Sequence, residues 1–204
     1  MTTTPKSRSD NGVGGYDTMV RMESASPLTP PNPPYSMPWF ADLESVELAP
    51  NLFAAREASD QADVERGTPN GIVNYSVKVS ALLVDYRYEV RSLAIETEHP
   101  GGINATFIRA NLVGDFANMA GRRRLAQVDK DGEWVSYRPY FRYDGPPLSP
   151  TDDVLIEVAR IYAACYALDL KPTSRVEKGL NLKRSTAENW VRRAKDRGYV
   201  YAEA

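Results

Sequence analysis

The chain has 204 residues, 42% of them hydrophobic and 25% charged, which is close to the average of globular proteins and allows a packed core over most of its length. Its formal net charge of −2 argues against a protein that coats nucleic acid with its whole surface. No apolar stretch approaches the roughly 20 residues that cross a bilayer, and the N-terminus lacks the apolar core of a signal peptide. We therefore expect a cytoplasmic protein that does not contact a membrane.

The charge is unevenly placed along this nearly neutral chain. Residues 171–204 carry nine Lys or Arg and four Asp or Glu, a balance of +5, which leaves −7 on residues 1–170. Such an asymmetry between two parts of a chain hints at a local site for a polyanion. The basic C-terminal end is where we expect that site.

Residues 1–40 hold seven of the fifteen prolines and few residues that could form a core. We expect this Pro- and Ser-rich tail to be disordered. Its last part, residues 27–40, has the composition of an extended polyproline II motif that ends in two exposed aromatic residues, Trp39 and Phe40. Such motifs dock on protein partners, and a plain linker is the alternative.

Residues 41–143 are predicted to form a small antiparallel β-rich α+β domain with short helices. A short helix is expected within residues 53–64. Further on, apolar and polar residues alternate around Val77 and again around Tyr88, and this period of two indicates half-buried strands. Apolar residues at spacings of three to five within residues 103–124 predict helical pieces that pack on one face of the sheet.

Three consecutive arginines, Arg122, Arg123 and Arg124, follow these helical pieces. They are either a second phosphate contact beside a basic helix or an ordinary surface run. The only cysteine, Cys165, has the spacing of an inert core thiol, and the only histidine, His99, has no catalytic or metal-binding companion close by in the sequence. We therefore expect no enzymatic activity, no metal and no cofactor.

Residues 144–150, with the sequence DGPPLSP, are expected to be a short stiff linker, and residues 151–204 a unit of three helices. The first helix has apolar residues at spacings of three and four. Pro172 cannot continue that helix, whereas Thr173 or Ser174 can cap a second, short helix. The residues of this second helix that we expect to face inward are Val176 and Leu180. A third helix is expected from about residue 184 to residue 197, closed by Gly198 in a left-handed conformation.

The third helix has an apolar and a polar side. An arc of about 100° on the helical wheel holds the residues that we expect to be buried: Ala187, Trp190, Val191 and Ala194. Ser185 and Glu188 have the spacing of a capping box. The polar side and the start of the helix hold the residues that we expect to contact DNA: Lys183, Arg184, Ser185, Thr186, Asn189, Arg192 and Arg193.

A short helix, a tight turn and a longer helix with the small residue Ala187 at the close crossing are the parts of a helix-turn-helix unit, whose second helix enters the major groove. Asn189 is the leading base reader, because Asn and Arg side chains make bidentate hydrogen bonds to adenine and guanine edges. Arg184 is compatible with base or phosphate contact. Phosphate contacts are expected from Arg192, Arg193, Lys178, Lys183 and Lys195.

The stretch RSTAENWVRRAKDRGYV, residues 184–200, resembles the SRSTAxRWVRRARxxGLL ending of helix-turn-helix proteins that are common in actinobacteria and their phages. The preceding IYAACYALDLKPTSRVEKGL is similar to the helices that lead into that ending, so the resemblance covers about 50 residues. Lys183 stands where these proteins usually have a serine cap, which would let the helix begin one or two residues later. The resemblance implies a core role for Trp190 and DNA binding by Arg184, Ser185, Thr186 and Asn189.

We therefore expect a sequence-specific double-stranded DNA-binding protein, a transcriptional regulator of an actinobacterium or its phage, that reads the major groove with helix 185–197. One such helix covers only a few base pairs, so a homodimer or a second reading element is expected. The β-rich domain would then provide dimerisation, ligand sensing or a second DNA contact. The alternative is an accessory or adaptor protein of a phage or mobile element, acting in recombination or packaging, that binds a protein partner through the tail and the β-rich domain.

Overall fold

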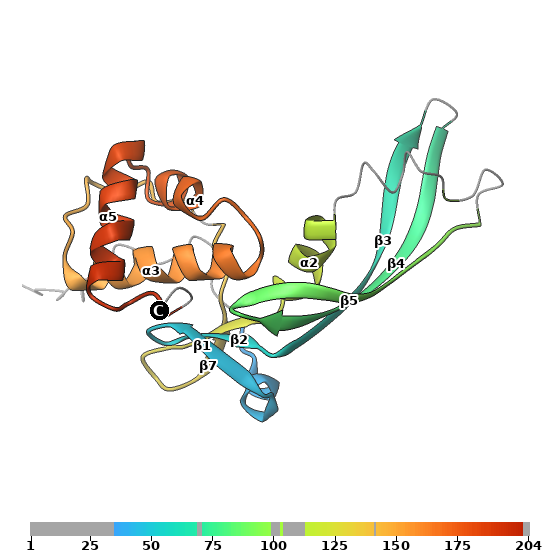
Figure 1. Ribbon diagram of the computed structural model, residues 1–204, viewed down its shortest axis with the longest axis horizontal. Helices are drawn as coiled ribbons and strands as arrows, with labels where there is room; N and C mark the ends of the chain where they lie inside the picture. The colour runs from blue at the N-terminus through green and yellow to red at the C-terminus, as the bar shows by residue number, and fades with distance from the viewer. Residues whose placement is uncertain (1–34, 69–70, 99–102, 104–112, 141, 202–204) are drawn as a thin grey trace, which may run out of the picture.

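The computed structural model describes residues 35–68, 71–98, 103, 113–140 and 142–201. In this part of the chain it shows two antiparallel sheets and, at the C-terminal end, three consecutive α-helices (Figure 1). The predicted α+β class, with the β-rich part first and three helices last, is confirmed. The three helices form one end of the molecule, the longer sheet projects at the other end, and the smaller sheet lies below and between them in Figure 1.

The smaller sheet has the strand order β1-β2-β6-β7, and each pair is antiparallel. Its strands are β1 (Ser45–Ala49), β2 (Leu52–Ala55), β6 (Leu125–Val128) and β7 (Trp134–Ser136). β1 and β2 form a tight hairpin, in which Asn51 has a positive φ of 59°. Because β6 and β7 come from much later in the chain, this sheet joins the two ends of the β-rich part.

Residues 35–42 belong to the fold and not to a tail. Ser36 forms a β-bridge with Val135, and the short 3-10 helix η1 (Pro38–Asp42) follows. Phe40 is fully buried, whereas Trp39 is 41% exposed. The prediction of a disordered tail is therefore wrong for residues 35–40, and so is the predicted exposure of Phe40. Residues 1–34 lie outside the described part of the chain.

The reason for this difference is a contact between distant parts of the sequence. Met37 and Phe40 fill a small core cluster together with Ala55 of β2 and Ala126 of β6. Trp134 of β7 stacks on Phe40 with 5.1 Å between ring centres. A proline-rich composition carries no signal for partners that lie so far along the chain.

The longer sheet has the order β3-β4-β5 and is also antiparallel. Its strands are β3 (Glu57–Thr68), β4 (Gly71–Val84) and β5 (Arg87–Glu96). The predicted helix within residues 53–64 is wrong, because these residues lie mainly in β2 and β3. Every residue of β3 has a partner in β4, and this ladder outweighs the modest helical preference of the Ala, Glu and Gln residues in the segment.

β4 and β5 confirm the strands predicted from the alternation around Val77 and Tyr88, and both of these side chains are buried. The strands meet in a two-residue turn formed by Asp85 and Tyr86. The φ values of these two residues are 45° and 62°, which is the pattern of a type I′ hairpin turn. This turn type matches the twist of the paired strands and fixes their register.

α2 (Val113–Gly121) packs on one face of the longer sheet. Phe116 of this helix is buried in the same core cluster as Val77 and Val79 of β4. The helical pieces predicted within residues 103–124 are confirmed for α2, whereas residues 104–112 lie outside the described part of the chain.

The three C-terminal helices are α3 (Asp152–Ala167), α4 (Pro172–Gly179) and α5 (Arg184–Asp196), in the predicted order. Each ends in the same way, because the N–H of the second residue past the helix cap donates to a carbonyl in its last turn. This is the Schellman motif, which requires a left-handed residue just past the end of the helix. Those residues are Asp169 (φ 54°), Asn181 (φ 52°) and Gly198 (φ 71°). The predicted closure of the third helix by Gly198 is confirmed.

The main hydrophobic core runs without a break from the two sheets into the three helices. α3 packs on β1 and contacts β5. Arg160 of α3 donates from Nε to the carbonyl of Pro50 at 2.8 Å, and Arg87 of β5 pairs with Asp169 at 2.8 Å. Residues 144–150 are irregular and connect two parts that share this core.

Candidate nucleic-acid interface

α4, the turn that follows it and α5 form the unit that positions the candidate site. Val176 and Leu180 are buried, as predicted. The predicted cap at Thr173 or Ser174 is wrong, because α4 already begins at Pro172. Asn181 takes the left-handed conformation, and the N–H of Leu182 donates to the carbonyl of Glu177 at 2.9 Å. This turn ends α4 and starts α5 in a new direction (Figure 1).

One side of α5 is buried against α3 and α4. The buried residues are those predicted from the helical wheel: Ala187, Trp190, Val191 and Ala194. Ala187 and Ala194 are fully buried, and such small side chains let helices cross closely. Trp190 is a core residue, so its ring is not a platform for nucleic-acid bases.

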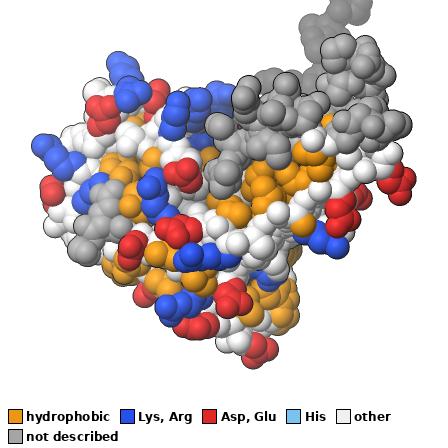
Figure 2. Space-filling model, turned by 45° about the vertical axis from the view of Figure 1, so that its right-hand side comes forward, with side chains coloured by type: hydrophobic (Ala, Val, Ile, Leu, Met, Phe, Trp, Pro, Cys, Tyr) orange, Lys and Arg blue, Asp and Glu red, His pale blue; other side chains and the backbone are white. Residues whose placement is uncertain are grey.

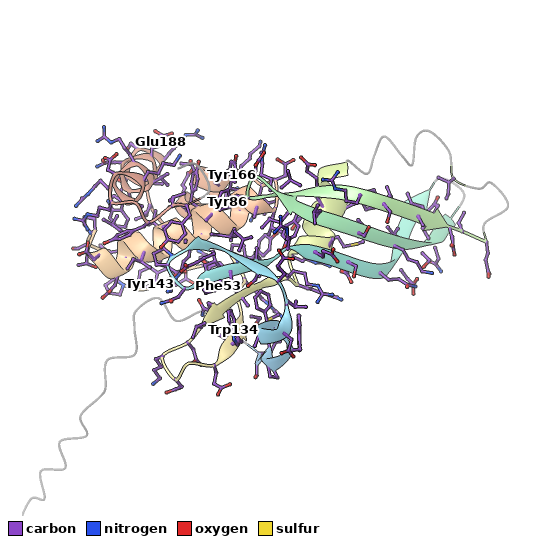
Figure 3. The ribbon with its side chains drawn as sticks, turned by 60° about the horizontal axis from the view of Figure 1, so that its bottom comes forward. Phe53, Tyr86, Trp134, Tyr143, Tyr166 and Glu188 are labelled. Atoms are coloured by element: carbon purple, nitrogen blue, oxygen red, sulfur yellow. The ribbon has the colours of Figure 1, made fainter. Side chains whose placement is uncertain are left out.

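The opposite side of α5, with the residue that precedes it, is a polar surface that we call the reading face. Two of its residues, Thr186 and Arg193, are half-buried and the others are exposed. Figure 3 shows Glu188 of this face on the outer side of the helical end, away from the strands. The reading face brings together the DNA-contacting residues predicted on and just before the third helix, except Lys195, and it also holds two acidic residues. It consists of Lys183, Arg184, Ser185, Thr186, Glu188, Asn189, Arg192, Arg193 and Asp196.

The reading face has four basic and two acidic side chains. Arg184 donates from Nε to Oε1 of Glu188 at 2.9 Å, and Arg192 donates from Nη2 to Oδ1 of Asn189 at 3.1 Å. Elsewhere on the helical end, basic and acidic side chains are interspersed on the side drawn in Figure 2. The reading face is therefore basic on balance.

The start of α5 agrees with the start predicted at about residue 184, but its predicted capping does not. Lys183 is the residue that precedes the helix, α5 already begins at Arg184, and no side chain caps it. The predicted capping box between Ser185 and Glu188 is wrong, because the Glu188 carboxylate pairs with Arg184 one turn earlier in the helix.

Lys195, which we predicted to lie near phosphates, is on the α3 side of α5. Its Nζ donates to the hydroxyl of Tyr162 at 3.0 Å and lies 4.5 Å from the centre of that ring. Lys195 therefore helps to fix α5 on α3 and is not part of the reading face. Lys178 of α4 is exposed.

Arg122, Arg123 and Arg124 do not form one exposed basic run. Arg123 pairs with Asp60 at 3.2 Å, and the Arg124 guanidinium lies 5.1 Å from the centre of the Trp39 ring. Arg122 is exposed. These residues follow α2, which lies beside the longer sheet, with α4 between α2 and α5 in Figure 1. The structure does not bring them next to the reading face.

A buried polar group between β7 and α3 was missed from the sequence. The hydroxyl of Tyr137 donates to Oε1 of Glu157 at 3.0 Å, and Arg160 lies 3.4 Å from Oε2 of Glu157. Burial raises the pKa of Glu157, and burial together with the nearby carboxylate raises the pKa of Tyr137. The available signal was the position of Glu157 three residues after Val154, on the apolar side of the helix.

The described residues hold no group of three or more His, Cys, Asp or Glu side chains that could bind a metal ion. Cys165 is fully buried, and burial raises the pKa of its thiol to about 12, so the predicted inert core thiol is confirmed. His99 lies outside the described part of the chain. None of the helices that the structure describes is long and apolar enough to cross a membrane.

Comparisons of the chain with known protein families, with curated proteins and with solved structures each give no match. Any assignment of function to this chain therefore depends on the geometry and chemistry of its own residues. Among the described residues, the reading face is the surface on which the sequence predictions and the arrangement of the helices agree.

Proposed function

We propose that this chain is a sequence-specific double-stranded DNA-binding protein that inserts α5 into the major groove. The observation that carries the proposal is that α5 is held on one side by α3 and α4, while its other side presents Arg184, Asn189 and Arg192 to solvent. The major groove is about 12 Å wide and admits an α-helix. A rigidly supported helix with an exposed basic side has the shape and charge for this role.

The exposed side chains divide into two roles. Asn189 would read a base, because a carboxamide makes two hydrogen bonds to the N6 and N7 edge of adenine. Arg192 holds Asn189 Oδ1 in the free protein and would move to a phosphate when DNA binds. Lys183, Arg193 and Lys178 would contact phosphates, which fix position and supply affinity without reading sequence.

The biological role that we propose is transcriptional regulation in the cytoplasm, by a protein that an actinobacterium or its phage encodes. The resemblance of residues 184–200 to helix-turn-helix proteins of these sources supports this role. A single reading helix covers too few base pairs to select one genomic site, so we expect the protein to act as a homodimer or with a second reading element. A second DNA contact at Arg122 would need a footprint that reaches past α4.

The test is selection of bound fragments from sheared genomic and random duplex DNA at about 150 mM salt, followed by sequencing. The proposal expects an enriched motif for the full chain and loss of one position of that motif for Asn189→Ala. Arg142→Ala is the matched surface control, because Arg142 is exposed and lies outside the reading face, on the segment before α3. It should leave the motif unchanged.

Three results separate the proposal from its alternatives. A motif with two-fold symmetry would support a homodimer. Retention of DNA without a motif would contradict sequence-specific reading and favour an accessory role in recombination or packaging. No retention at any salt concentration would contradict DNA binding and leave the protein-adaptor interpretation.

A further inference from the structure

Arg184 and Glu188 form an exposed ion pair on the reading face. The Arg184 Nε lies 2.9 Å from Oε1 of Glu188, and the side chains are 72% and 53% exposed. Glu188 lies between Arg184 and Arg192 on the same side of α5, and Asp196, the other acidic residue of the reading face, lies two turns further along the helix. A surface that bound only phosphates would be weakened by the Glu188 carboxylate, because like charges repel.

Helix stability does not account for the pair. A basic residue in the first turn of a helix is disfavoured by the helix dipole. The order with the basic residue before the acidic one, at a spacing of four, is also the less favourable order for such pairs. An exposed pair of this kind contributes little to stability. The arrangement is better explained by what it does to the Arg184 guanidinium.

The contact with Glu188 leaves the fork of Arg184 free to read a base. A guanidinium has five N–H donors, and the bond to Glu188 uses the one on Nε. The two Nη groups then present a planar pair of donors, which matches the O6 and N7 acceptors of guanine in the major groove. Because Glu188 already restricts the side chain, less conformational entropy is lost when the fork binds.

We propose that Arg184 and Glu188 act as one reading unit, in which Arg184 reads a guanine and Glu188 is the positioning residue that holds it. Where the guanine is absent, the Glu188 carboxylate repels the DNA phosphates and no base contact compensates for this repulsion. The same residue therefore lowers the affinity for other sequences. The proposal rests on the proposed function, since it requires α5 to lie in the major groove.

The test is the Glu188→Ala variant, which should change two measured quantities in opposite directions. Removing one negative charge should raise the affinity for random duplex DNA several-fold, while the preference for guanine at one motif position should fall about tenfold. Arg184→Lys should lose the same guanine preference, because a lysine ammonium cannot make the bidentate contact. Both quantities are measured by titrating labelled duplexes that differ at that one base pair.

Asp196→Ala is the matched control, since Asp196 is an exposed acidic residue of the same face that lies two turns further along α5 than Glu188, out of reach of Arg184. It should raise the affinity for random DNA and leave the guanine preference unchanged. Glu188→Gln should keep part of the preference, because its amide oxygen can still accept from Arg184.

Two outcomes would overturn the proposal. One is a Glu188→Ala variant that keeps the full guanine preference. The other is a variant that loses affinity for the motif and for random DNA to the same extent, with its helical circular dichroism intact, which would mark a purely structural role. If the unmodified chain enriches no motif at all, the proposed function itself fails, and that result is distinct from both.

Discussion

The hydroxyl of Tyr137 donates a hydrogen bond to the largely buried carboxylate of Glu157, with 3.0 Å between the two oxygens. Tyr137 directly follows β7, whereas Glu157 lies within α3. The bond therefore joins the β-rich part to the helix on which α4 and α5 pack. It places an ionisable group inside the contact between the two parts of the molecule.

The stability of the protein should depend on pH through Glu157. Burial raises the pKa of this group above its ordinary value of 4.5, so the folded state favours the protonated form. Its contribution to stability is complete below pH 4.5 and is lost as the pH rises through the raised pKa. Glu157→Gln removes the titration, so the stability of the wild type relative to this variant should fall as the pH rises above the ordinary pKa of 4.5.

Urea unfolding at several pH values measures this difference. Tyr137→Phe is a second variant, and it should enlarge the loss of stability with rising pH that Glu157→Gln removes. The reason is that the hydrogen bond from Tyr137 lowers the pKa of Glu157, so the pKa rises further without it. Parallel pH profiles for wild type and Glu157→Gln would contradict the assignment to Glu157.

The elements that could be predicted from the sequence are those defined by local periodicity. The strands around Val77 and Tyr88 follow from a period of two, and the buried stripe of α5 around Trp190 follows from a period near four. These patterns repeat often enough to outweigh single exceptions. The order of the three C-terminal helices followed from Pro172 and Gly198, which act on the backbone locally.

The features that the sequence did not reveal depend on distant partners. Phe40 is buried only because Ala55 and Ala126 lie next to it in the fold. Residues 53–55 lie in a strand because β2 pairs with β1 and β6, and residues 57–64 because every residue of β3 pairs with β4. In the candidate site, the residues of the reading face could be predicted, but the pairing of Glu188 with Arg184 could not. In the first turn of α5, a capping box with Ser185 and an ion pair with Arg184 compete for the Glu188 carboxylate.

Phe40→Ala should strongly destabilise the protein if residues 35–42 are part of the fold. Phe40 is fully buried and stacks on Trp134, so its removal would leave a cavity that costs about 3–5 kcal/mol. Trp39→Ala is the neighbouring control, because 41% of Trp39 is exposed, and it should cost clearly less. Equal effects of the two substitutions on the free energy of unfolding in urea would show that the segment is not anchored by Phe40.

The turn between α4 and α5 should tolerate glycine but not alanine at Asn181. This residue has a φ of 52°, a conformation that costs most L-residues about 1 kcal/mol and costs glycine almost nothing. Asn181→Ala should therefore lower the free energy of unfolding by about 1 kcal/mol, and Asn181→Gly should leave it nearly unchanged. A loss of the same size for both variants would mean that the Asn181 side chain, and not its backbone, holds the turn.

Two basic residues of α5, Arg193 and Lys195, should differ in their effect on DNA binding. Arg193 belongs to the reading face, so Arg193→Ala should weaken binding to all sequences alike and reduce the slope of log affinity against log salt by about one. Lys195 instead donates to the Tyr162 hydroxyl on α3, so Lys195→Ala should leave that slope nearly unchanged and lower thermal stability.

The comparison is a set of binding titrations at several salt concentrations, and it is matched because each variant removes one positive charge from the same helix. A smaller slope for Lys195→Ala than for Arg193→Ala would place the phosphate contacts on the α3 side of α5. Since that side is packed against the rest of the molecule, such a result would mean that α3 must move away from α5 when DNA binds.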